Sequence, residues 1–359
     1  MESKKYVLTD EVIEFNGIKL YRIRALKDFK DVKAGDLGGY IEKESNLSQE
    51  GTCWVYNDAK VYQDALVCEY SEVYGDAEVH DRAIISGYAN VFGIADVYGN
   101  AKITGDAEVC DASVCDKAIV SGCAKIYDES KVYGNAKVYD CAEVYGYAEV
   151  FEDAQVYGKA HIYQEALVCD KALVFGNANV YGKAEVSGEA NIYNHARVYG
   201  NSKVSGSAEV FDDAQVYGNA SVNINSKVFE SAEVYGRSLI SWSAQVYGNA
   251  KVFGDSIIEG NVHVYGNAEI YDRARVYHDA KVYDDAQVFE NARVGYRTKV
   301  YGNSKVCGKS RVECKVKIHG DAIISDLELL GNMKIDIDET PNIKEEPKLS
   351  NSFRRQLSN

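Results

Sequence analysis

A small residue, a variable residue and a large aliphatic residue recur every six positions along most of the chain. The aliphatic positions step by six from Val55 to Val109 and, after one step of five, from Val114 to Ile324, which makes 46 consecutive hexapeptides without an insertion. The first four residues of each unit alternate as in a β-strand, so the small and aliphatic side chains share one face. The last two are often Gly, Asn or Asp, which tolerate the positive φ of a sharp corner. The pattern predicts a chain that coils around a narrow core.

A second period, of 18 residues, indicates how many strands make up one coil. From Val114 onward, the residues that follow the aliphatic positions fall into three classes. Two classes are aromatic in ten of twelve cases, and the third in three of twelve. Three strands per coil explain this period, because like residues then stack from one coil to the next. We therefore expect an all-β, single-stranded, three-sided parallel β-helix of about fifteen coils.

The segments outside the repeat are expected to cover its ends. Residues 1–50 contain alternating stretches such as KLYRIRAL and are predicted to form an N-terminal cap. Without a cap, the first coil would expose unpaired backbone groups. The repeat is assigned to residues 51–325, and residues 326–359 are predicted to form a C-terminal cap and a flexible polar tail.

Outward aromatic residues are the main candidates for a binding surface. Residues 18 positions apart should lie above one another and form stacked series. Such series either only stabilise the sheet or also present an adhesive surface to another subunit, a protein partner or a stacked ligand. One series comprises Tyr139, Tyr157, Phe175, Tyr193 and Phe211, and the other Tyr145, Tyr163, Tyr181, Tyr199 and Tyr217.

The third face carries shorter side chains and is the candidate seam of a homo-oligomer. Its members include Leu167 with Cys169, Leu239 with Ser241, and Ile257. A flat strip of this kind suits close packing against a second copy of the chain.

Composition narrows the classes of partner. The 359 residues carry a formal net charge of −15, which argues against a nucleic acid bound through its phosphates. No apolar run reaches membrane-spanning length, so no membrane partner is expected, and the first residues lack the apolar core of a signal peptide. Nine cysteines without C-x-x-C spacing are typical of a reducing compartment. We expect a cytoplasmic protein of a bacterium or of cells infected by its phage.

The sequence gives no metal site. A zinc site would need three converging histidines, and the nonapeptide calcium-binding pattern is absent. Cys123 and Cys141 lie 18 residues apart, so they should stack at one corner, where they are expected to remain free thiols.

The unit resembles the hexapeptide repeat of left-handed parallel β-helix proteins over about residues 51–325, and this resemblance implies the left-handed coil. The segment from Asp28 to Ala59 is similar to the N-terminal stretch of YdcK-like proteins through VKAG…GG and NLSQ…CW. These are bacterial hexapeptide-repeat proteins generally labelled acetyltransferases. The resemblance implies an acyl-CoA-dependent O- or N-acetyltransferase that uses acetyl-CoA. Here, however, tyrosine mostly follows the aliphatic residue, where the commoner acyltransferase pattern often has glycine.

Acyl transfer would require a general base, for which histidine is the residue to consider. His161 and His263 precede aliphatic residues, whereas His195 and His278 occupy predicted corners. By spacing, His161 and His195 should share one corner about two coils apart, and His263 and His278 another about one coil apart. A solvated surface histidine is the simpler interpretation of each. The array also has no loop insertion of the kind that usually builds an acceptor pocket in this class of enzyme.

Three hypotheses of function follow. The leading one is a non-catalytic, rod-like scaffold or binding protein, without a cofactor, whose aromatic faces contact a protein partner or further copies of the chain. The second is the acyl-CoA-dependent acyltransferase. The third is a phage-borne protein that sequesters or inhibits a host factor.

Overall fold

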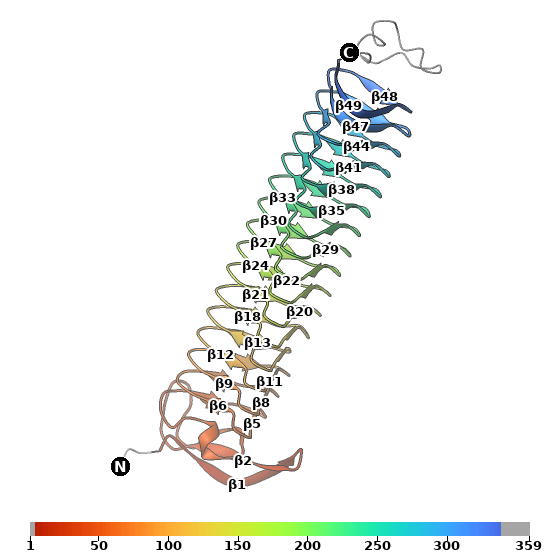
Figure 1. Ribbon diagram of the computed structural model, residues 1–359. Coiled ribbons are helices and arrows are strands. Elements are labelled where there is room, and N and C mark those ends of the chain that lie inside the picture. The colour runs from red at the N-terminus through yellow and green to blue at the C-terminus, as the bar shows by residue number, and fades with distance from the viewer. Residues whose placement is uncertain (1–3, 339–359) are drawn as a thin grey trace, which may run out of the picture. The chain divides into compact units, whose positions relative to one another are not determined.

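A computed structural model describes residues 4–338, which fall into two compact units divided between Asn194 and His195 (Figure 1). In each unit, short parallel strands stack coil on coil, and three strands make up one coil. Stacked strands generally pair 18 residues apart, as Lys131 does with Glu149. The fold is a parallel β-solenoid, as the 18-residue period predicts. The tail expected at residues 339–359 lies outside the described residues.

Within each unit we number the sides of a coil 1, 2 and 3 in chain order. In the first unit, side 1 consists of β5 (Lys60–Val61), β8 (Glu78–Val79), β11 (Asp96–Val97), β14 (Ser113–Val114), β17 (Lys131–Val132), β20 (Glu149–Val150), β23 (Leu167–Val168) and β26 (Glu185–Val186). Side 2 consists of β6 (Leu66–Val67), β9 (Ile84–Ile85), β12 (Lys102–Ile103), β15 (Ile119–Val120), β18 (Lys137–Val138), β21 (Gln155–Val156), β24 (Leu173–Val174) and β27 (Asn191–Ile192). Side 3 consists of β4 (Trp54–Val55), β7 (Glu72–Val73), β10 (Asn90–Phe92), β13 (Glu108–Cys110), β16 (Lys125–Ile126), β19 (Glu143–Val144), β22 (His161–Ile162) and β25 (Asn179–Val180).

The second unit repeats this plan. Its side 1 consists of β29 (Lys203–Val204), β32 (Ser221–Val222), β35 (Leu239–Trp242), β38 (Ile257–Gly260), β41 (Arg275–Tyr277), β44 (Arg293–Gly295) and β47 (Arg311–Ile318). Side 2 consists of β30 (Glu209–Val210), β33 (Lys227–Val228), β36 (Gln245–Val246), β39 (His263–Val264), β42 (Lys281–Val282) and β45 (Lys299–Val300). Side 3 consists of β28 (Arg197–Val198), β31 (Gln215–Val216), β34 (Glu233–Val234), β37 (Lys251–Val252), β40 (Glu269–Ile270), β43 (Gln287–Val288), β46 (Lys305–Cys307) and β48 (Ile323–Ser325).

The core of each unit is a column of aliphatic and small side chains that are almost fully removed from solvent. Val150 and Ala148, for example, have no exposed surface. Serine replaces alanine at several buried positions, where its hydroxyl needs a partner. That of Ser130 donates to the carbonyls of Tyr127 and Val144, at 2.8 and 3.1 Å. The period of six therefore predicts the core correctly, including its buried polar members.

The corners generally begin two residues after each aliphatic residue. Most strands are two residues long rather than the four expected, although the flanking backbone still pairs, as Tyr139 N–H does with the carbonyl of Val156 at 3.0 Å. The left-handed φ generally falls on the first corner residue, such as Asp140 at 58°. The Asp140 carboxylate accepts the N–H of Gly158, one coil further on, at 3.1 Å. Acidic corner residues thus bind the backbone of the next coil.

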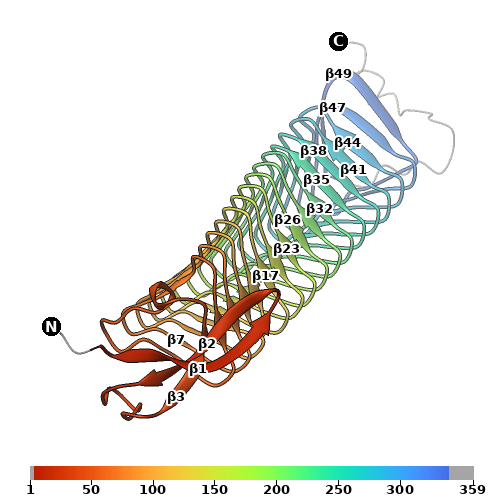
Figure 2. The same cartoon turned by 90° about the horizontal axis from the view of Figure 1, so that it is seen from below.

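The N-terminal segment forms an antiparallel sheet beside the first coils (Figure 2). It contains β1 (Tyr6–Phe15), β2 (Ile18–Ala25), β3 (Leu37–Ile41) and one 3-10 turn, η1 (Glu44–Asn46). β3 pairs in parallel with β5, which joins the sheet to the solenoid. The buried Lys5 donates from Nζ to the carbonyl of Cys53 at 2.9 Å, and Tyr6 packs edge-on against Trp54.

The last coils contain longer strands than the rest of the second unit. β47 passes from side 1 to side 2 as one long strand that pairs with both β44 and β45. β49 (Glu328–Ile337) pairs in parallel with β47. Across residues 4–338, no helix has the length and apolar character required to cross a membrane.

The narrow core predicts a strong dependence on side-chain volume. Ala172 is fully buried, whereas its neighbour Lys171 is an exposed corner residue. Ala172→Leu should lower the free energy of unfolding by about 1–3 kcal/mol, because added methylenes in a packed core force neighbours apart. Lys171→Leu introduces the same side chain one residue away and should change stability little. Chemical denaturation of both variants checks this, and equal losses would contradict the core assignment.

Candidate functional site

Aromatic rings line sides 2 and 3 of the first unit as two stacked rows, which we call the ring ladders. Each ring follows the aliphatic residue of its strand and stacks on the ring one coil away. Ring centroids lie 4.8–5.0 Å apart, and ring planes agree within 7°. The side 2 ladder contains Tyr139, Tyr157, Phe175 and Tyr193, and the side 3 ladder Tyr127, Tyr145, Tyr163 and Tyr181.

The second unit has ring ladders of the same geometry. Centroids again lie 4.8–5.0 Å apart, with planes within 8°. The side 2 ladder contains Phe211, Phe229, Tyr247, Tyr265, Tyr283 and Tyr301, and the side 3 ladder Tyr199, Tyr217, Tyr235, Phe253, Tyr271 and Phe289. The predicted tyrosine ladders are therefore present, while their use as a binding surface stays a prediction.

Ladder tyrosines are half-buried and keep their protons. The hydroxyl of Tyr127 donates to the Glu143 carboxylate at 3.0 Å, and that of Tyr217 to Glu233 at 2.9 Å. Burial, and then the neighbouring carboxylate, raises the pKa of both phenols. Burial also raises the pKa of Tyr283 to about 12. The ladders therefore present ring edges and neutral hydroxyl groups.

The stacked series predicted from the sequence start after Val114, so they do not include the aromatic rings of the earliest coils. On side 1, His80 stacks between Tyr62 and Tyr98, with centroids 4.9 and 5.1 Å away. Burial alone would lower the pKa of His80, but the hydrogen bond to Asp96 raises it. Applying the 18-residue period to the first coils would have found this stack.

Side 1 loses its rings where the seam was predicted. In the first unit Tyr133 still stacks on Phe151, and Cys169 then takes the next ladder position, two residues after Leu167. In the second unit Leu239 pairs with Ile257, and Ser241, which is buried, pairs with Glu259. The five seam residues thus fall into both units, and their role as a seam stays a prediction.

The histidines proposed for acyl transfer lie in separate surroundings. His161 begins β22, with Nδ1 3.5 Å from the Glu143 carboxylate and its ring edge-on to Tyr145. His195 belongs to the second unit and is largely exposed, with Nδ1 3.9 Å from Asp213. His161 therefore occupies a strand rather than the predicted corner.

The other two histidines also occupy different positions within a coil. His263 begins β39, edge-on to Tyr247, and burial together with Lys281 lowers its pKa. His278 lies in the corner after β41 and stacks on Tyr296, with centroids 4.5 Å apart. The two therefore do not share a corner, because the residue before each aliphatic position belongs to the strand.

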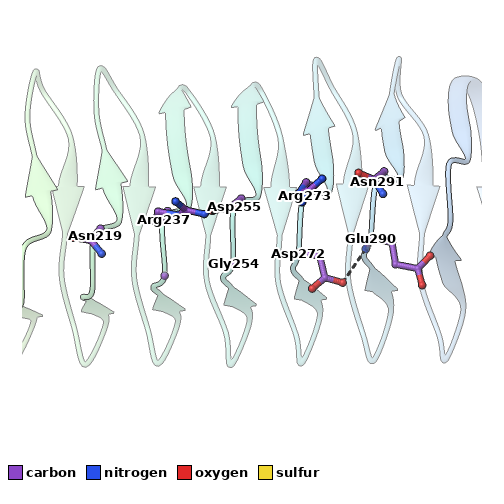
Figure 3. Close-up of a pocket in the computed structure, with 9 residues that line it drawn as sticks. Asn219, Arg237, Gly254, Asp255, Asp272, Arg273, Glu290 and Asn291 are labelled. Carbon is purple, nitrogen blue, oxygen red and sulfur yellow. Dashed lines mark hydrogen bonds and ion pairs between the residues drawn. The ribbon is translucent and has the colours of Figure 1, made fainter.

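An open groove of about 740 Å³ follows the corner between sides 3 and 1 of the second unit (Figure 3). Arg237 donates through Nε and Nη2 to the two carboxylate oxygens of Asp255, at 2.7 and 2.9 Å. Asp272 accepts the N–H of Glu290, one coil further on, at 3.1 Å, and Arg273 lies beside Asp272 in the same coil. These groups bind successive coils to each other, so most of the polar lining is already engaged.

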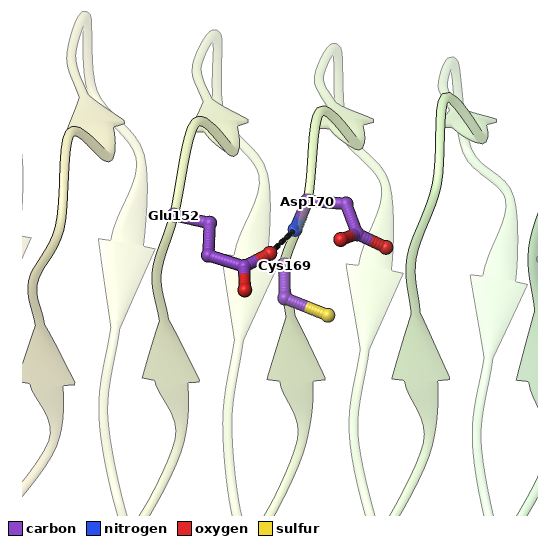
Figure 4. A group of neighbouring side chains, drawn as sticks. All are labelled: Glu152, Cys169 and Asp170. Carbon is purple, nitrogen blue, oxygen red and sulfur yellow. Dashed lines mark hydrogen bonds between the residues drawn. The ribbon is translucent and has the colours of Figure 1, made fainter.

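Glu152, Cys169 and Asp170 form the one cluster of potential metal ligands among the described residues (Figure 4). The Glu152 carboxylate accepts the N–H of Asp170 at 2.8 Å, and that of Asp170 accepts the N–H of Gly188 at 2.7 Å. Burial and the charge of Asp170 raise the pKa of Cys169 to about 11. The carboxylates thus perform the same corner role as Asp140, and the thiol is not activated.

Cys123 and Cys141 stack at one corner of the first unit, as their spacing predicts. Both are exposed free thiols, and their Sγ atoms are 2.9 Å apart. The hydrogen bond to Cys141 raises the pKa of Cys123. This pair is the closest contact between thiols that the described residues contain.

The repeat is similar to that of known proteins. Residues 244–260 match the family model of the YdcK β-solenoid repeat. The uncharacterized acetyltransferase YdcK of Escherichia coli K12 is 40% identical over 62 residues, which are 15% of this chain and 19% of that protein. The match thus spans about a fifth of the relative's length. Together with the parallel β-solenoid of both units, these matches fit a YdcK-like repeat protein.

Proposed function

We propose that the protein is a non-catalytic binding scaffold whose ring ladders contact a protein partner or further copies of the chain. The observation that carries this proposal is the ordered stacking of half-buried rings on sides 2 and 3. Amphipathic rings of this kind favour protein interfaces, where their edges bury apolar area and their hydroxyls bond a partner.

The stacking supports binding because it orders the rings before a partner arrives. Tyr157, for instance, lies between Tyr139 and Phe175 at 4.9 and 4.8 Å. A ring held on both faces has little rotamer freedom left to lose on association, which favours affinity. The coils repeat the same group at a constant spacing, so a partner would meet a periodic surface.

Charges beside the ladders are largely paired. Lys227 lies 2.8 Å from Glu209 next to the side 2 ladder of the second unit, and Lys251 lies 3.6 Å from Glu233 next to the side 3 ladder. Paired charges present little net field, so these surfaces favour a protein over a polyanion such as nucleic acid.

We also propose a cytoplasmic location. All nine cysteines are free, and two exposed thiols lie within 2.9 Å of each other at Cys123 and Cys141. Such a pair is compatible with a reducing compartment, in which glutathione and thioredoxin keep thiols reduced.

The ladder proposal predicts a selective loss of binding. Replacing Tyr139, Tyr157 and Tyr193 by Ser should abolish capture of a partner in pull-downs, or the part of self-association that the ladders mediate and light scattering measures, because it removes the ordered rings. Phe at the same positions keeps the stacking and separates the role of the rings from that of the hydroxyls.

The matched control replaces three exposed corner tyrosines of the same unit by Ser, namely Tyr70, Tyr88 and Tyr147. Their exposed fractions are 45%, 60% and 62%, so they are more accessible than the ladder rings. Retained binding in this control, with loss in the ladder variant and native circular dichroism in both, supports the proposal. Equal behaviour of the two variants would contradict it.

Acyl transfer is the second candidate, favoured by the name of the relative in Escherichia coli. His161 or His195 would serve as the base, with acetyl-CoA as the acyl donor. A cofactor with a dissociation constant of about 10 µM would add about 2.7 kcal/mol of stability at about 1 mM. The scaffold proposal predicts no such thermal shift. A shift that His161→Ala or His195→Ala abolishes would support the enzyme instead.

A further inference from the structure

Side 1 of the second unit carries a row of arginines in three successive coils. Arg275 of β41 pairs with Arg293 of β44, and Arg293 pairs with Arg311 of β47. Like charges directly opposite each other destabilise a sheet. Arg275 and Arg293 are exposed, and neither guanidinium has a carboxylate within ion-pair distance among residues 4–338. The row therefore displays two guanidinium groups that have no ion-pair partner in this part of the chain.

The carboxylate of Glu313, two residues after Arg311 on the same strand, is already engaged. Arg311 donates from Nη2 to Glu313 at 3.1 Å. The Tyr277 hydroxyl reaches the same carboxylate at 2.5 Å, with its ring over Gly295, where a Cβ would come within 2.7 Å of the ring. The hydrogen bond from Tyr277, and then Arg311, lowers the pKa of Glu313. Glu313 thus accepts hydrogen bonds from Tyr277 and Arg311, and Arg293 adds a weaker charge interaction with it beyond ion-pair distance.

Apolar residues stand at the corner that follows side 1. In five successive corners at the 18-residue spacing, the residue with left-handed φ is Ile224 (62°), Trp242 (65°), Gly260 (92°), His278 (58°) and Tyr296 (52°), so four of the five are not glycine. Ile224, Trp242 and Tyr296 are 40%, 60% and 49% exposed. A bulky residue is strained in this conformation, and glycine is not. Strained, exposed apolar residues in one row indicate a binding role rather than a folding role.

These groups together form what we call the arginine–aromatic face: Trp242, Tyr296, Arg275 and Arg293, with Leu239 and Ile257 beside them. Trp, Tyr and Arg are the residue types that dominate the energetic centres of protein interfaces. The face also holds the exposed Glu259 beside Tyr277, but its two arginines have no ion-pair partner, so carboxylates at a matching spacing on a partner would complement it.

The first unit of the same chain is rich in carboxylates. Residues 1–194 contain 33 acidic and 19 basic residues, whereas residues 275–317 contain 5 acidic and 10 basic residues. On side 1 of the first unit, Glu78 of β8 and Asp96 of β11 pair in successive coils. One oxygen of Glu78 accepts the Tyr62 hydroxyl and one oxygen of Asp96 contacts the His80 ring, both at 3.1 Å, so each carboxylate has its other oxygen for a partner. They hold the same place in the hexapeptide as Arg275 and Arg293. Both rows repeat at the strand spacing of about 4.8 Å, so two carboxylates can face two guanidinium groups in register.

We propose that the arginine–aromatic face docks onto the acidic side 1 of the first unit of a second copy of this chain. Opposite charges make this contact favourable, while contact of the face with itself would bring like charges together. The proposal goes beyond the ring ladders, because it uses side 1 rather than sides 2 and 3.

The test is self-association of the full chain, measured by sedimentation and light scattering at about 50 mM and about 500 mM salt, because salt screens such contacts. Wild type should associate at low salt and weaken at high salt. R275E/R293E should weaken association by about tenfold or more, as expected for close charge pairs. The matched control is K281E/K299E, the same charge change in paired strands of side 2, which should leave association within about twofold.

A charge swap makes the test specific to the two surfaces. E78K/D96K should also weaken self-association, because it places lysine opposite the arginines of the second copy. Mixing it with R275E/R293E should restore association in the heterodimer, where each altered surface meets an opposite charge. Circular dichroism and thermal unfolding establish that every variant keeps the solenoid.

Several results would overturn the proposal. These are a monomer at all concentrations and salt levels, equal weakening by K281E/K299E, and failure of the mixed variants to associate. Binding of added poly-glutamate or heparin by a chain that does not self-associate would assign the face to another polyanion. The salt-dependent self-association that R275E/R293E removes should persist in the ladder variant of Tyr139, Tyr157 and Tyr193. Any self-association mediated by the ladders should be lost in that variant and persist in R275E/R293E, so failure of the ladder proposal and failure of this one are distinguishable.

Discussion

Backbone pairing between successive coils, in a register of about 18 residues, is the constraint on which each unit depends. A two-residue strand such as β21 has no stability alone, and its N–H and C=O groups are satisfied by the strands one coil away. The same register places Val on Val and Ala on Ala in a column too narrow for other side chains. A change of volume or register at one coil must therefore be accommodated by its neighbours.

The register also determines the surface, because every outward group is repeated above itself. Rings at 4.8–5.0 Å form ladders, and acidic corner residues reach the next coil's N–H. Because each side chain lies above a like position, the charges in a row determine whether they pair or repel. Where Lys and Glu alternate along a strand position the charges pair, as Lys251 does with Glu233, whereas Arg275 above Arg293 leaves the charge exposed. Function in such a fold is therefore a property of rows rather than of single residues.

Much of this could be predicted from the sequence, because the period of six specifies burial and the period of 18 specifies stacking. The core, the ladders and the contact of Cys123 with Cys141 follow directly from those two numbers. Strand lengths and the surroundings of the histidines could not be predicted, since both depend on where the corner begins. Nor could the buried Lys5 be foreseen, because its partner Cys53 lies 48 residues further along the chain.

The backbone conformation of the corner residues cannot be predicted from the two periods. In the sequence Trp242 and Gly260 are two variable residues, and in the structure they hold the same left-handed position in successive coils. Glycine adopts that conformation without strain, so a tryptophan there must be retained for another reason. Its exposed ring makes little contribution to the core, and neither does that of Tyr296. Strain without burial is the feature that separates the arginine–aromatic face from the ring ladders, whose rings stabilise the coils whether or not they bind a partner.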